Sequence, residues 1–325
     1  MEEPLAGVHD PAAAGASAAD LARRIRDNLR AVIHAPDETL DLCVLCLLSE
    51  GHLIIEDLPG VGKTTLAKTL ARSVDLSFSR IQFTPDLLPS DVTGVNVYNQ
   101  RTHEFEFRPG PVFANVLLVD EINRTSPKTQ AALLESMQER QVTIDGHTYH
   151  LAPPFMVMAT QNPIEYEGTY PLPEAQLDRF TMRIEIGYPS LAAEARMLTE
   201  QTTQMPLESL SPVASAQEVI GAIEEARRVY VEESVQRYVV ALLRHTRGDA
   251  RLHLGASPRA GINLLRVAKA RAVAAGRDYV VPDDVKAVAP PVLAHRLILA
   301  PEARSSGLGD LDIVREAVER TPVPV

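Results

Sequence analysis

The sequence contains no tryptophan, and aromatic side chains make up only 5% of its 325 residues. Proteins that bind single-stranded nucleic acid stack bases on aromatic side chains, so this scarcity disfavours that class of function. No apolar stretch reaches the roughly 18 residues that cross a bilayer, and we therefore expect no membrane insertion and a cytoplasmic location. Residues 1–19 lack a basic segment followed by an apolar one, so we predict a disordered lead-in instead of a signal peptide.

Cysteine is also scarce: Cys43 and Cys46 are the only two, and both lie within one apolar run. Their C-x-x-C spacing occurs in redox and zinc sites, but the chain has no second pair to complete a four-thiolate site. We therefore favour small core residues of a buried helix over a redox or zinc site. The nine histidines show no H-E-x-x-H spacing, so no catalytic zinc site is predicted.

Positive charge is in deficit, because 32 Lys and Arg residues face 43 Asp and Glu residues and the formal net charge is −11. A molecule of this sign repels phosphate backbones at long range, so duplex DNA is not an expected partner unless a local basic patch exists. The hydrophobic share of 45% is typical of a globular protein, and the length allows two domains that each bury a core.

The chain does contain a glycine-rich turn over 57–65, which follows the apolar run 53–55 and opens a predicted helix over 66–74. A strand, a tight loop and a helix in this order point several backbone N–H groups at one spot, backed by the positive end of the helix dipole. Lys63 would reach the β- and γ-phosphates of a nucleotide, and Thr64 would place its hydroxyl on Mg²⁺. The residues predicted to bind a triphosphate here are Pro59, Gly60, Val61, Gly62, Lys63, Thr64 and Thr65.

This turn departs from G-x-x-x-x-G-K-[ST] at one position, where Asp57 replaces the first glycine. Aspartate tolerates a left-handed backbone better than most residues, so we expect the loop to keep its shape. The alternative is a structural Gly-Pro turn with a surface lysine. We disfavour that alternative because the flanking strand and helix also fit a phosphate loop.

Two carboxylates, Asp120 and Glu121, end the apolar run 116–119, which is typical of a parallel strand covered on both faces. Sheets of this class bind ligands at the carboxyl ends of their strands. Asp120 would hold Mg²⁺ through its water shell, and Glu121 would orient and deprotonate an attacking water. A pair of helix-capping residues is the alternative, since acidic side chains also favour helix starts.

A further polar residue is expected at the same edge of the sheet. The predicted strand 155–160 leads into Asn162, whose amide would hold the lytic water or the γ-phosphate beside Asp120 and Glu121. An ordinary Asn-Pro turn is the alternative. Only the order of the strands favours the functional interpretation.

The overall pattern predicts an α/β domain with a parallel sheet, followed by helices. Strands are predicted at 53–55, 79–83, 116–119, 155–160 and 182–186, and hairpins at 95–107 and 141–149. Early helices are predicted at 19–34, with Asp20 as the cap, and at 37–50. Another helix starts at 126–127, with Ala131, Leu134 and Met137 on one face.

From residue 190 onward the pattern is helical almost throughout. It includes a capping box over 215–218, a helix over 257–275 and another that starts at 282. The stretch 301–325 predicts a single helix with a proline-containing tail. We therefore expect a disordered segment 1–19, an α/β domain 20–187, an all-helical domain 188–300 and a C-terminal helix and tail 301–325.

Four stretches resemble the AAA+ ATPases and, within them, the MoxR family, and the similarity extends over about 21–299. They are PGVGKT (59–64), LVDEINR (118–124), ATQNP (159–163) and YPLPEAQLDRF (170–180). The first stretch is shared by many nucleotide hydrolases, whereas the last is nearly specific to the family. The resemblance implies a P-loop AAA+ core with a five-stranded parallel sheet and a smaller helical lid domain.

The resemblance also implies roles for single residues. Lys63 and Thr64 correspond to Walker A, Asp120 and Glu121 to Walker B, Asn162 to sensor 1, Arg179 to the arginine finger and Arg259 to sensor 2. An arginine finger reaches the γ-phosphate bound by a neighbouring subunit. Both arginines could instead be ordinary surface or ion-pair residues. The hairpins 95–107 and 141–149 correspond to the helix-2 and pre-sensor-1 insertions, expected to couple hydrolysis to a bound protein.

The family suggests a Mg²⁺-dependent ATPase that forms a ring, usually hexameric, and acts as a chaperone. Its members mature partner enzymes or insert their metal cofactors, and their genes commonly adjoin one for a von Willebrand A-domain protein. ATP and Mg²⁺ are thus the expected cofactors, with a protein client and no nucleic acid. Two alternatives stay open: a helicase-like motor that translocates on nucleic acid, and a nucleotide-gated scaffold without turnover.

Overall fold

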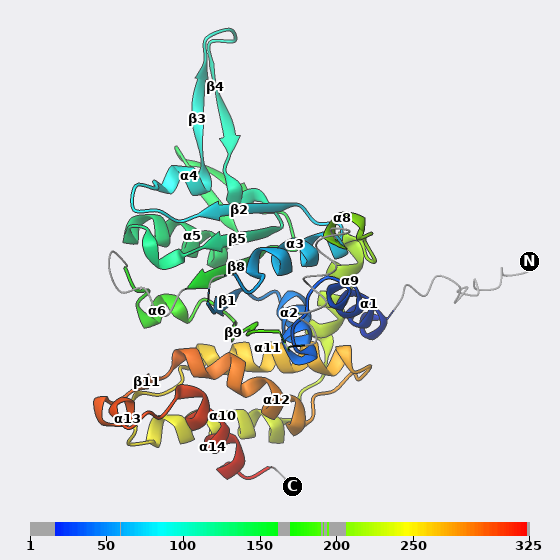
Figure 1. The fold of residues 1–325 in the computed structure, drawn as a ribbon, viewed down its shortest axis with the longest axis vertical. Coiled ribbons are helices and arrows are strands. Elements are labelled where there is room, and N and C mark those ends of the chain that lie inside the picture. Colours follow the sequence, from blue (N-terminus) through cyan, green and yellow to red (C-terminus); the bar gives the residue numbers. More distant parts are fainter. Residues whose placement is uncertain are drawn as a thin grey trace, which may run out of the picture.

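The computed structural model describes residues 17–58, 60–161, 170–189, 191, 194 and 206–323. Figure 1 shows an α/β layer built on one sheet, a helical layer packed against it, and a long hairpin that projects from the opposite end of the α/β layer. Two predicted site residues, Pro59 and Asn162, lie outside the described residues.

The sheet has five parallel strands in the order β2-β5-β8-β1-β9, which confirms the predicted fold class. Because all strands run the same way, their carboxyl ends meet at one edge of the sheet and their amino ends at the other. The register places Gln82 opposite Asp120 and Glu56 opposite Gln161. The strands are β1 (Leu53–Glu56), β2 (Phe78–Gln82), β5 (Val116–Asp120), β8 (Met156–Gln161) and β9 (Met182–Ile184).

Both faces of the sheet are buried, because successive side chains of a strand point to opposite faces. Leu53 and Ile55 belong to one hydrophobic core, whereas Ile54 belongs to the other. The helices of the α/β layer are α1 (Ala18–Arg30), α2 (Asp37–Leu48), α3 (Lys63–Ser73), α4 (Pro89–Thr93), α5 (Pro127–Glu139) and α6 (Glu174–Leu177). Coverage on both faces explains why the central strands β5 and β8 are nearly continuous apolar runs.

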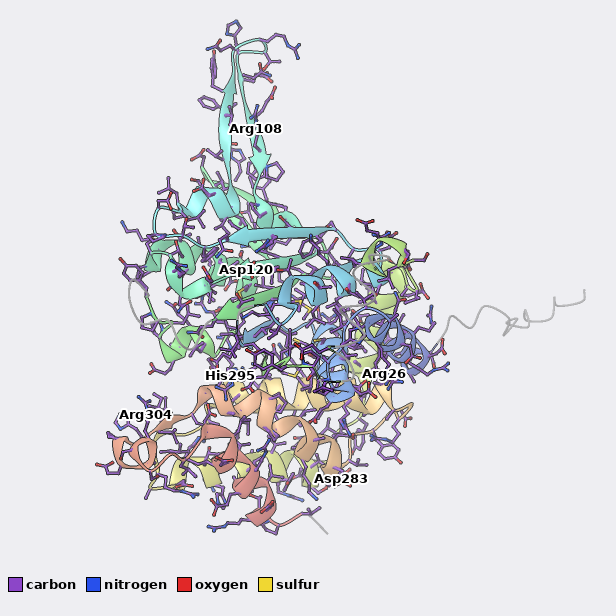
Figure 2. The ribbon with its side chains drawn as sticks, in the orientation of Figure 1. Arg26, Arg108, Asp120, Asp283, His295 and Arg304 are labelled. Carbon is purple, nitrogen blue, oxygen red and sulfur yellow. The ribbon has the colours of Figure 1, made fainter. Side chains whose placement is uncertain are left out.

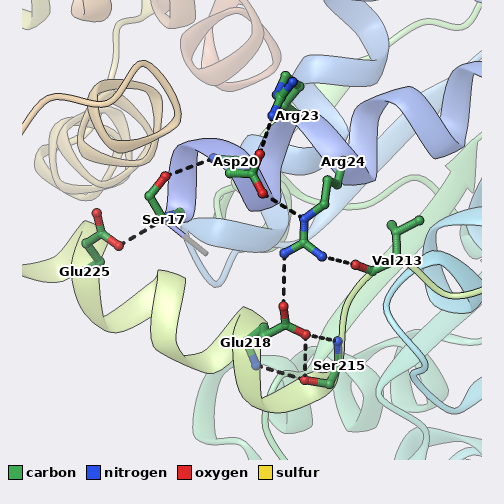
Figure 3. Close-up of polar contacts among 9 residues, drawn as sticks. Ser17, Asp20, Arg23, Arg24, Val213, Ser215, Glu218 and Glu225 are labelled. Atoms are coloured by element: carbon green, nitrogen blue, oxygen red, sulfur yellow. Dashed lines mark hydrogen bonds and ion pairs between the residues drawn. The ribbon is translucent and has the colours of Figure 1, made fainter. Parts of the chain in front are cut away.

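The cap predicted for α1 is wrong. Ser17 caps this helix, and its hydroxyl accepts a hydrogen bond from the backbone N–H of Asp20 at 3.2 Å. Asp20 instead binds Arg24 at 3.1 Å, one helical turn later. Figure 3 shows that Arg24 also donates to the Glu218 carboxylate, at 3.0 Å, near the start of α9 (Ala216–Arg228). These contacts attach the first helix to the chain that leads into the helical layer.

The helical layer also contains α10 (Glu233–Gly248), α11 (Pro258–Ala274), α12 (Pro282–Leu293), α13 (Pro301–Ser305) and α14 (Asp310–Arg320). The short α8 (Pro206–Ser209) lies instead beside α3, where Arg72 donates to the Glu208 carbonyl at 2.7 Å (Figure 1). Ser215 caps α9, as predicted, and Ser257 caps α11, which begins where a helix was predicted. A short antiparallel pair, β10 (Leu252–Leu254) and β11 (Ile298–Leu299), interrupts the otherwise helical layer.

Two further details differ from the predictions. The stretch 301–325 does not form one helix, because Gly307 adopts a left-handed φ of 79° between α13 and α14. On α5, Ala131 is exposed, and the buried positions include Leu133, Leu134 and Met137. The core face of α5 is therefore shifted from the predicted one.

Two hairpins extend from the α/β layer. One consists of β3 (Gly94–Asn99) and β4 (Glu104–Pro109), and the other of β6 (Gln141–Ile144) and β7 (His147–His150), as predicted. Their side chains touch, because the Phe107 and Tyr149 rings stack with centroids 4.1 Å apart. Asn96 also donates to Asp145 at 2.7 Å. The two hairpins thus contact one another although residues 110–140 separate them in the chain.

Cys43 and Cys46 are fully buried in α2 and are not joined by a disulfide, so the prediction that they are core residues is confirmed. Burial raises the pKa of the Cys43 thiol to about 12, which leaves it unreactive at neutral pH. Among the described residues, no helix combines the length and apolar character that a membrane crossing requires.

Candidate active site

The predicted phosphate loop has the backbone that such a loop requires. Gly60 and Gly62 have φ angles of 89° and 93°, which side-chain-bearing residues rarely adopt. A Cβ built on either glycine meets no atom within 4 Å, so backbone conformation and not crowding requires glycine here. Gly62 precedes α3 without a side-chain cap, and the first turn of α3 has no acidic residue. The first N–H groups of α3 are therefore available to an anion.

Asp57 keeps the loop in shape, but not for the expected reason. It is not among the residues with a positive φ, so tolerance of a left-handed backbone is not what it contributes. Its carboxylate instead accepts hydrogen bonds from the backbone N–H groups of Leu58 at 2.8 Å and of Ile186 and Gly187 at 2.7 Å each. Asp57 therefore joins the start of the phosphate loop to the chain that leaves the sheet.

Lys63 lies between the loop and the acidic end of β5. Its ammonium donates to the carbonyl of Asp57 at 2.6 Å. Burial lowers the pKa of Lys63, and the negative charges of Asp57, Asp120 and Glu121 oppose that shift. Because these carboxylates act on the ammonium through space, the structure brings Lys63, Asp120 and Glu121 to one place.

Asp120 is held by two side chains from the neighbouring strands. Arg80 on β2 donates to one carboxylate oxygen at 2.6 Å, and the hydroxyl of Thr160 on β8 donates to the other at 3.3 Å. Asp120 is nearly buried, whereas Arg80 is half exposed. The orientation of this carboxylate is therefore fixed by the strands on both sides of β5.

Glu121 leaves the strand through a left-handed backbone, with φ and ψ both 55°. Its backbone N–H donates to the Thr160 hydroxyl at 2.9 Å. One carboxylate oxygen accepts from Gln82 at 2.5 Å and from Arg124 at 3.1 Å. The left-handed backbone turns Glu121 away from the strand direction. Gln82 and Arg124 both donate to a single oxygen of its carboxylate.

Sequence reasoning missed the residues that hold these carboxylates, namely Arg80, Gln82, Arg124 and Thr160. Gln82 and Thr160 act because strand pairing places them next to the end of β5, and pairing is not visible in a local pattern. One signal was present: Arg80 and Gln82 are polar residues two apart on a strand, so both point to the same side.

Thr64 and Asp120 suit a magnesium ion, because hydroxyl and carboxylate oxygens are the donors that Mg²⁺ prefers. Thr64 lies in the first turn of α3 and Asp120 at the carboxyl end of β5. Both Asp120 oxygens already accept hydrogen bonds, one from Arg80 and one from Thr160. Asp120 is therefore better suited to hold Mg²⁺ through bound water molecules than by direct ligation through both oxygens. The donor set fits the ion in that form.

Arg179 and Arg259 lie together in a different place, a cavity of about 570 Å³ between the α/β layer and the helical layer. No described residue of the phosphate loop lines this cavity. Its cationic lining consists of Arg140, Arg179, Arg227, Arg259, Arg266 and Lys269. Among the described residues, Glu50 pairs with Arg140 and Arg227, and no ion pair is formed by Arg179 or Arg259.

The cavity lies at the amino-end edge of the sheet. The Thr181 backbone N–H, just before β9, donates at 2.8 Å to the carbonyl of His52, just before β1. Both residues line the cavity, whereas Asp57 follows β1 at the opposite edge. Five residue steps of extended chain from His52 to Asp57 span about 16 Å. The structure therefore separates Arg179 and Arg259 from Lys63, Asp120 and Glu121.

Two family models match the chain: "ATPase family associated with various cellular activities (AAA)" over residues 52–182 and "AAA lid domain" over residues 231–317. The chain is 52% identical over 284 residues to the uncharacterized protein YeaC of Bacillus subtilis, across 87% of this chain and 89% of that one. It is 41% identical over 305 residues to the chaperone MoxR1 of Mycobacterium tuberculosis, across 91% of this chain and 80% of that one.

A solved structure agrees with the same assignment. The crystal structure of a candidate ATPase from Cytophaga hutchinsonii matches with a TM-score of 0.87 and 41% identity, across 95% of this chain and 96% of that one. The AAA match covers the phosphate loop and the paired carboxylates, and the lid match covers most of the helical layer. The chain therefore belongs to the MoxR family of AAA+ ATPases.

Proposed function

We propose that this ATPase hydrolyses ATP with Mg²⁺ at a site that two copies of the chain complete together. The separation of Lys63 from Arg179 across the sheet supports this proposal. An arginine side chain is shorter than the roughly 16 Å between the two edges. Arg179 is therefore too far from the phosphate loop of its own chain to contact a triphosphate bound there. We assign it to the triphosphate bound by a neighbouring copy. Arg259 lines the same cavity, so we assign it to the neighbour's nucleotide as well.

Each residue has a distinct task in this proposal. Lys63 and the N–H groups at the start of α3 bind the phosphates, while Thr64 and Asp120 hold Mg²⁺. When bound, Mg²⁺ neutralises charge on the β- and γ-phosphates. Glu121 orients the attacking water and takes its proton, while Gln82 and Arg124 bind one oxygen of its carboxylate and hold it in place. The role proposed for Asn162 rests on the sequence alone, because this residue lies outside the described part of the chain.

Copies that share sites in this way contact each other head to tail, and such contacts close into rings when the rotation allows. We propose a ring, hexameric as in the family, that acts on a protein client. The relative named chaperone MoxR1 supports a chaperone role. A von Willebrand A-domain partner, the insertion of a metal cofactor and a cytoplasmic location stay predictions from the sequence.

The domain limits at 187 and 300 also stay proposals. The last strand of the sheet ends at Ile184, and Gly187 has a left-handed φ of 72°. The C-terminal helix α14 contributes Ile313 and Val314 to the same core as Val285 of α12. Its first residue, Asp310, also binds Arg183 of β9 at 2.8 Å. These contacts associate the segment after residue 300 with both layers.

A mixing experiment tests the shared site. Lys63→Ala removes phosphate binding and Arg179→Ala removes the proposed finger, so each variant alone should lose hydrolysis. The two variants are then co-assembled in equal amounts. At some contacts, the intact phosphate loop of an Arg179→Ala chain meets the intact Arg179 of a neighbouring Lys63→Ala chain. Since half of the loops and half of the fingers are intact, roughly a quarter of the wild-type phosphate release should return if the contacts form at random.

The control for this experiment mixes Lys63→Ala with Glu121→Gln. Both changes damage the same half of the site, so that mixture should remain inactive. If the Lys63→Ala and Arg179→Ala mixture also remained inactive although the chains co-assemble, the shared site would be disproved. Hydrolysis that depends on added DNA and falls with salt would instead support the helicase-like alternative.

A further inference from the structure

Arg296 is a buried cation that extends from the helical layer into the turn before β9. It ends the 3-10 turn η4 (Ala294–Arg296), and its side chain is only 2% exposed. Figure 2 shows the adjacent His295 where the two layers meet. The guanidinium donates to the carbonyls of Phe180 at 2.6 Å and Thr181 at 3.2 Å. One arginine of the helical layer therefore fixes the backbone on the carboxyl side of Arg179.

Asp178, which precedes Arg179 in the chain, accepts hydrogen bonds from the same guanidinium. The Arg296 Nε–H donates to the Asp178 Oδ1 at 2.6 Å, and Arg296 Nη2 donates to the Asp178 carbonyl at 3.3 Å. Arg179 is thus flanked along the chain by residues that Arg296 binds. Because charge-assisted hydrogen bonds of this kind are strong when buried, the turn has little freedom to move independently of the helical layer.

The second oxygen of Asp178 reaches the helix that carries Arg259. Asp178 Oδ2 accepts from the Ser257 hydroxyl at 3.1 Å. The same hydroxyl oxygen accepts from the backbone N–H of Ala260 at 3.1 Å, as the cap of α11. One carboxylate therefore connects the residue before Arg179 with the cap two residues before Arg259.

We infer that Asp178 and Arg296 are positioning residues that hold Arg179 and Arg259 in a fixed relation on the face offered to the neighbouring copy. Neither of these two arginines forms an ion pair within the described chain, so their placement depends on the turn and the cap that Asp178 joins. This inference rests on the proposed function, since it concerns the half of the shared site that acts on the neighbour's nucleotide.

The inference predicts that a change at Asp178 impairs hydrolysis at the neighbour's site but not nucleotide binding by the altered chain itself. Asp178→Asn keeps the shape of the side chain but removes the charge that Arg296 binds. The variant should bind a fluorescent ATP analogue with unchanged Kd and lose at least about tenfold in kcat, because small displacements of reacting groups have effects of this size. Mixed with Lys63→Ala, which has an intact Asp178, it should recover phosphate release as Arg179→Ala does.

Mixing Asp178→Asn with Arg179→Ala should give no recovery, because both variants lack a well-placed finger. A structural defect in the nucleotide pocket of the variant would not be repaired by Lys63→Ala chains. The inference is therefore overturned if Lys63→Ala rescues Arg179→Ala but not Asp178→Asn, or if Asp178→Asn hydrolyses ATP at the wild-type rate. Failure of the Arg179→Ala mixture itself would overturn the proposed shared site, and this inference with it.

A second variant covers the case in which Asp178→Asn does not fold. Ser257→Ala removes a single bond to Asp178 and should lower kcat with unchanged nucleotide binding, whereas Ser257→Thr keeps the hydroxyl and should restore it. Loss of a helix cap also reduces stability. Ser215→Ala, which removes the cap of α9 without touching Asp178, is the matched control and should keep the wild-type kcat. Equal kcat values for Ser257→Ala and Ser215→Ala would contradict the inference.

Discussion

Glu121 combines a left-handed backbone with a carboxylate that two neighbouring side chains already bind. A left-handed conformation is unfavourable for a non-glycine residue by roughly 1–2 kcal/mol. The Thr160 hydroxyl, which accepts from the Glu121 N–H, helps to hold it in place. The backbone thus turns this side chain out of the direction of β5, where Gln82 and Arg124 bind it.

The Glu121→Gln variant should bind ATP but release phosphate at least about 100-fold more slowly, because the amide cannot accept the proton of the attacking water. Binding of a fluorescent ATP analogue and single-turnover phosphate release measure the two effects separately. The exposed Glu135 on α5 offers a matched control, since Glu135→Gln makes the same chemical change away from the site. Wild-type turnover in Glu121→Gln would show that another group is the base.

His52 is a buried imidazole, 6% exposed, that forms hydrogen bonds through both ring nitrogens within the α/β layer. Its Nδ1 accepts from the Val157 N–H at 3.0 Å and its Nε2 lies 3.2 Å from the Met137 carbonyl. Burial lowers the pKa of His52 to about 4, from 6.5. The unfolded chain therefore binds a proton between pH 6.5 and pH 4 that the folded chain does not, and stability must fall as the pH falls through this range.

The pKa shift of His52 predicts a loss of about 3 kcal/mol in the free energy of unfolding between pH 7 and pH 4. Urea unfolding of the wild type and of His52→Gln across this range should show a shallower pH dependence in the variant. Burial also keeps the pKa of His295 low, so the variant should retain part of the slope. His147→Gln, at an exposed position of β7, should leave the slope unchanged. Equal slopes in the wild type and His52→Gln would refute the assignment.

At the scale of elements, the two hairpins form one aromatic contact. Phe107 of β4 stacks on Tyr149 of β7, and both rings meet Phe113 edge to face. The second hairpin directly follows α5, which begins shortly after Glu121. A displacement of α5 would therefore be passed to both hairpins together, and this supports their proposed role in coupling hydrolysis to a client.

A double-mutant cycle measures this contact. Phe107→Leu and Tyr149→Leu should each destabilise the protein, and the two changes together should show a coupling energy of about 0.5–1.5 kcal/mol in thermal or urea unfolding. The pair Phe105→Leu and Tyr149→Leu is the control, because Phe105 packs on Tyr98 and not on Tyr149. Additive effects of Phe107→Leu and Tyr149→Leu would show that the hairpins are energetically independent.

Local patterns predicted most of the elements, because strands, caps and tight turns depend on residues close together in the chain. The five strands, both hairpins and the capping box at Ser215 are all readable in this way. The errors also have local causes. An aspartate and a serine three residues earlier are both acceptable caps, so a local pattern does not decide between Asp20 and Ser17. A single glycine such as Gly307 does not by itself indicate a break in a helical pattern.

At the scale of the whole molecule, the order of the strands and the motifs led to Lys63, Asp120 and Glu121, which the structure brings together. The partners of these residues were not predictable, since Gln82 and Thr160 act through strand pairing. Nor does a linear pattern show that Arg179 and Lys63 lie at opposite edges of one sheet. Because such patterns carry no information about distance, the resemblance supplied the role of Arg179 but not its separation from Lys63.

With the proposed half-sites on opposite edges of the sheet, activity would depend on the number of joined copies. Two copies make one complete site and an open row of three makes two, so an open row always has one site fewer than it has chains. Only closure gives every chain a complete site. Specific activity should therefore rise with protein concentration and fall steeply on dilution, and the enzyme would hydrolyse little ATP until enough copies have met.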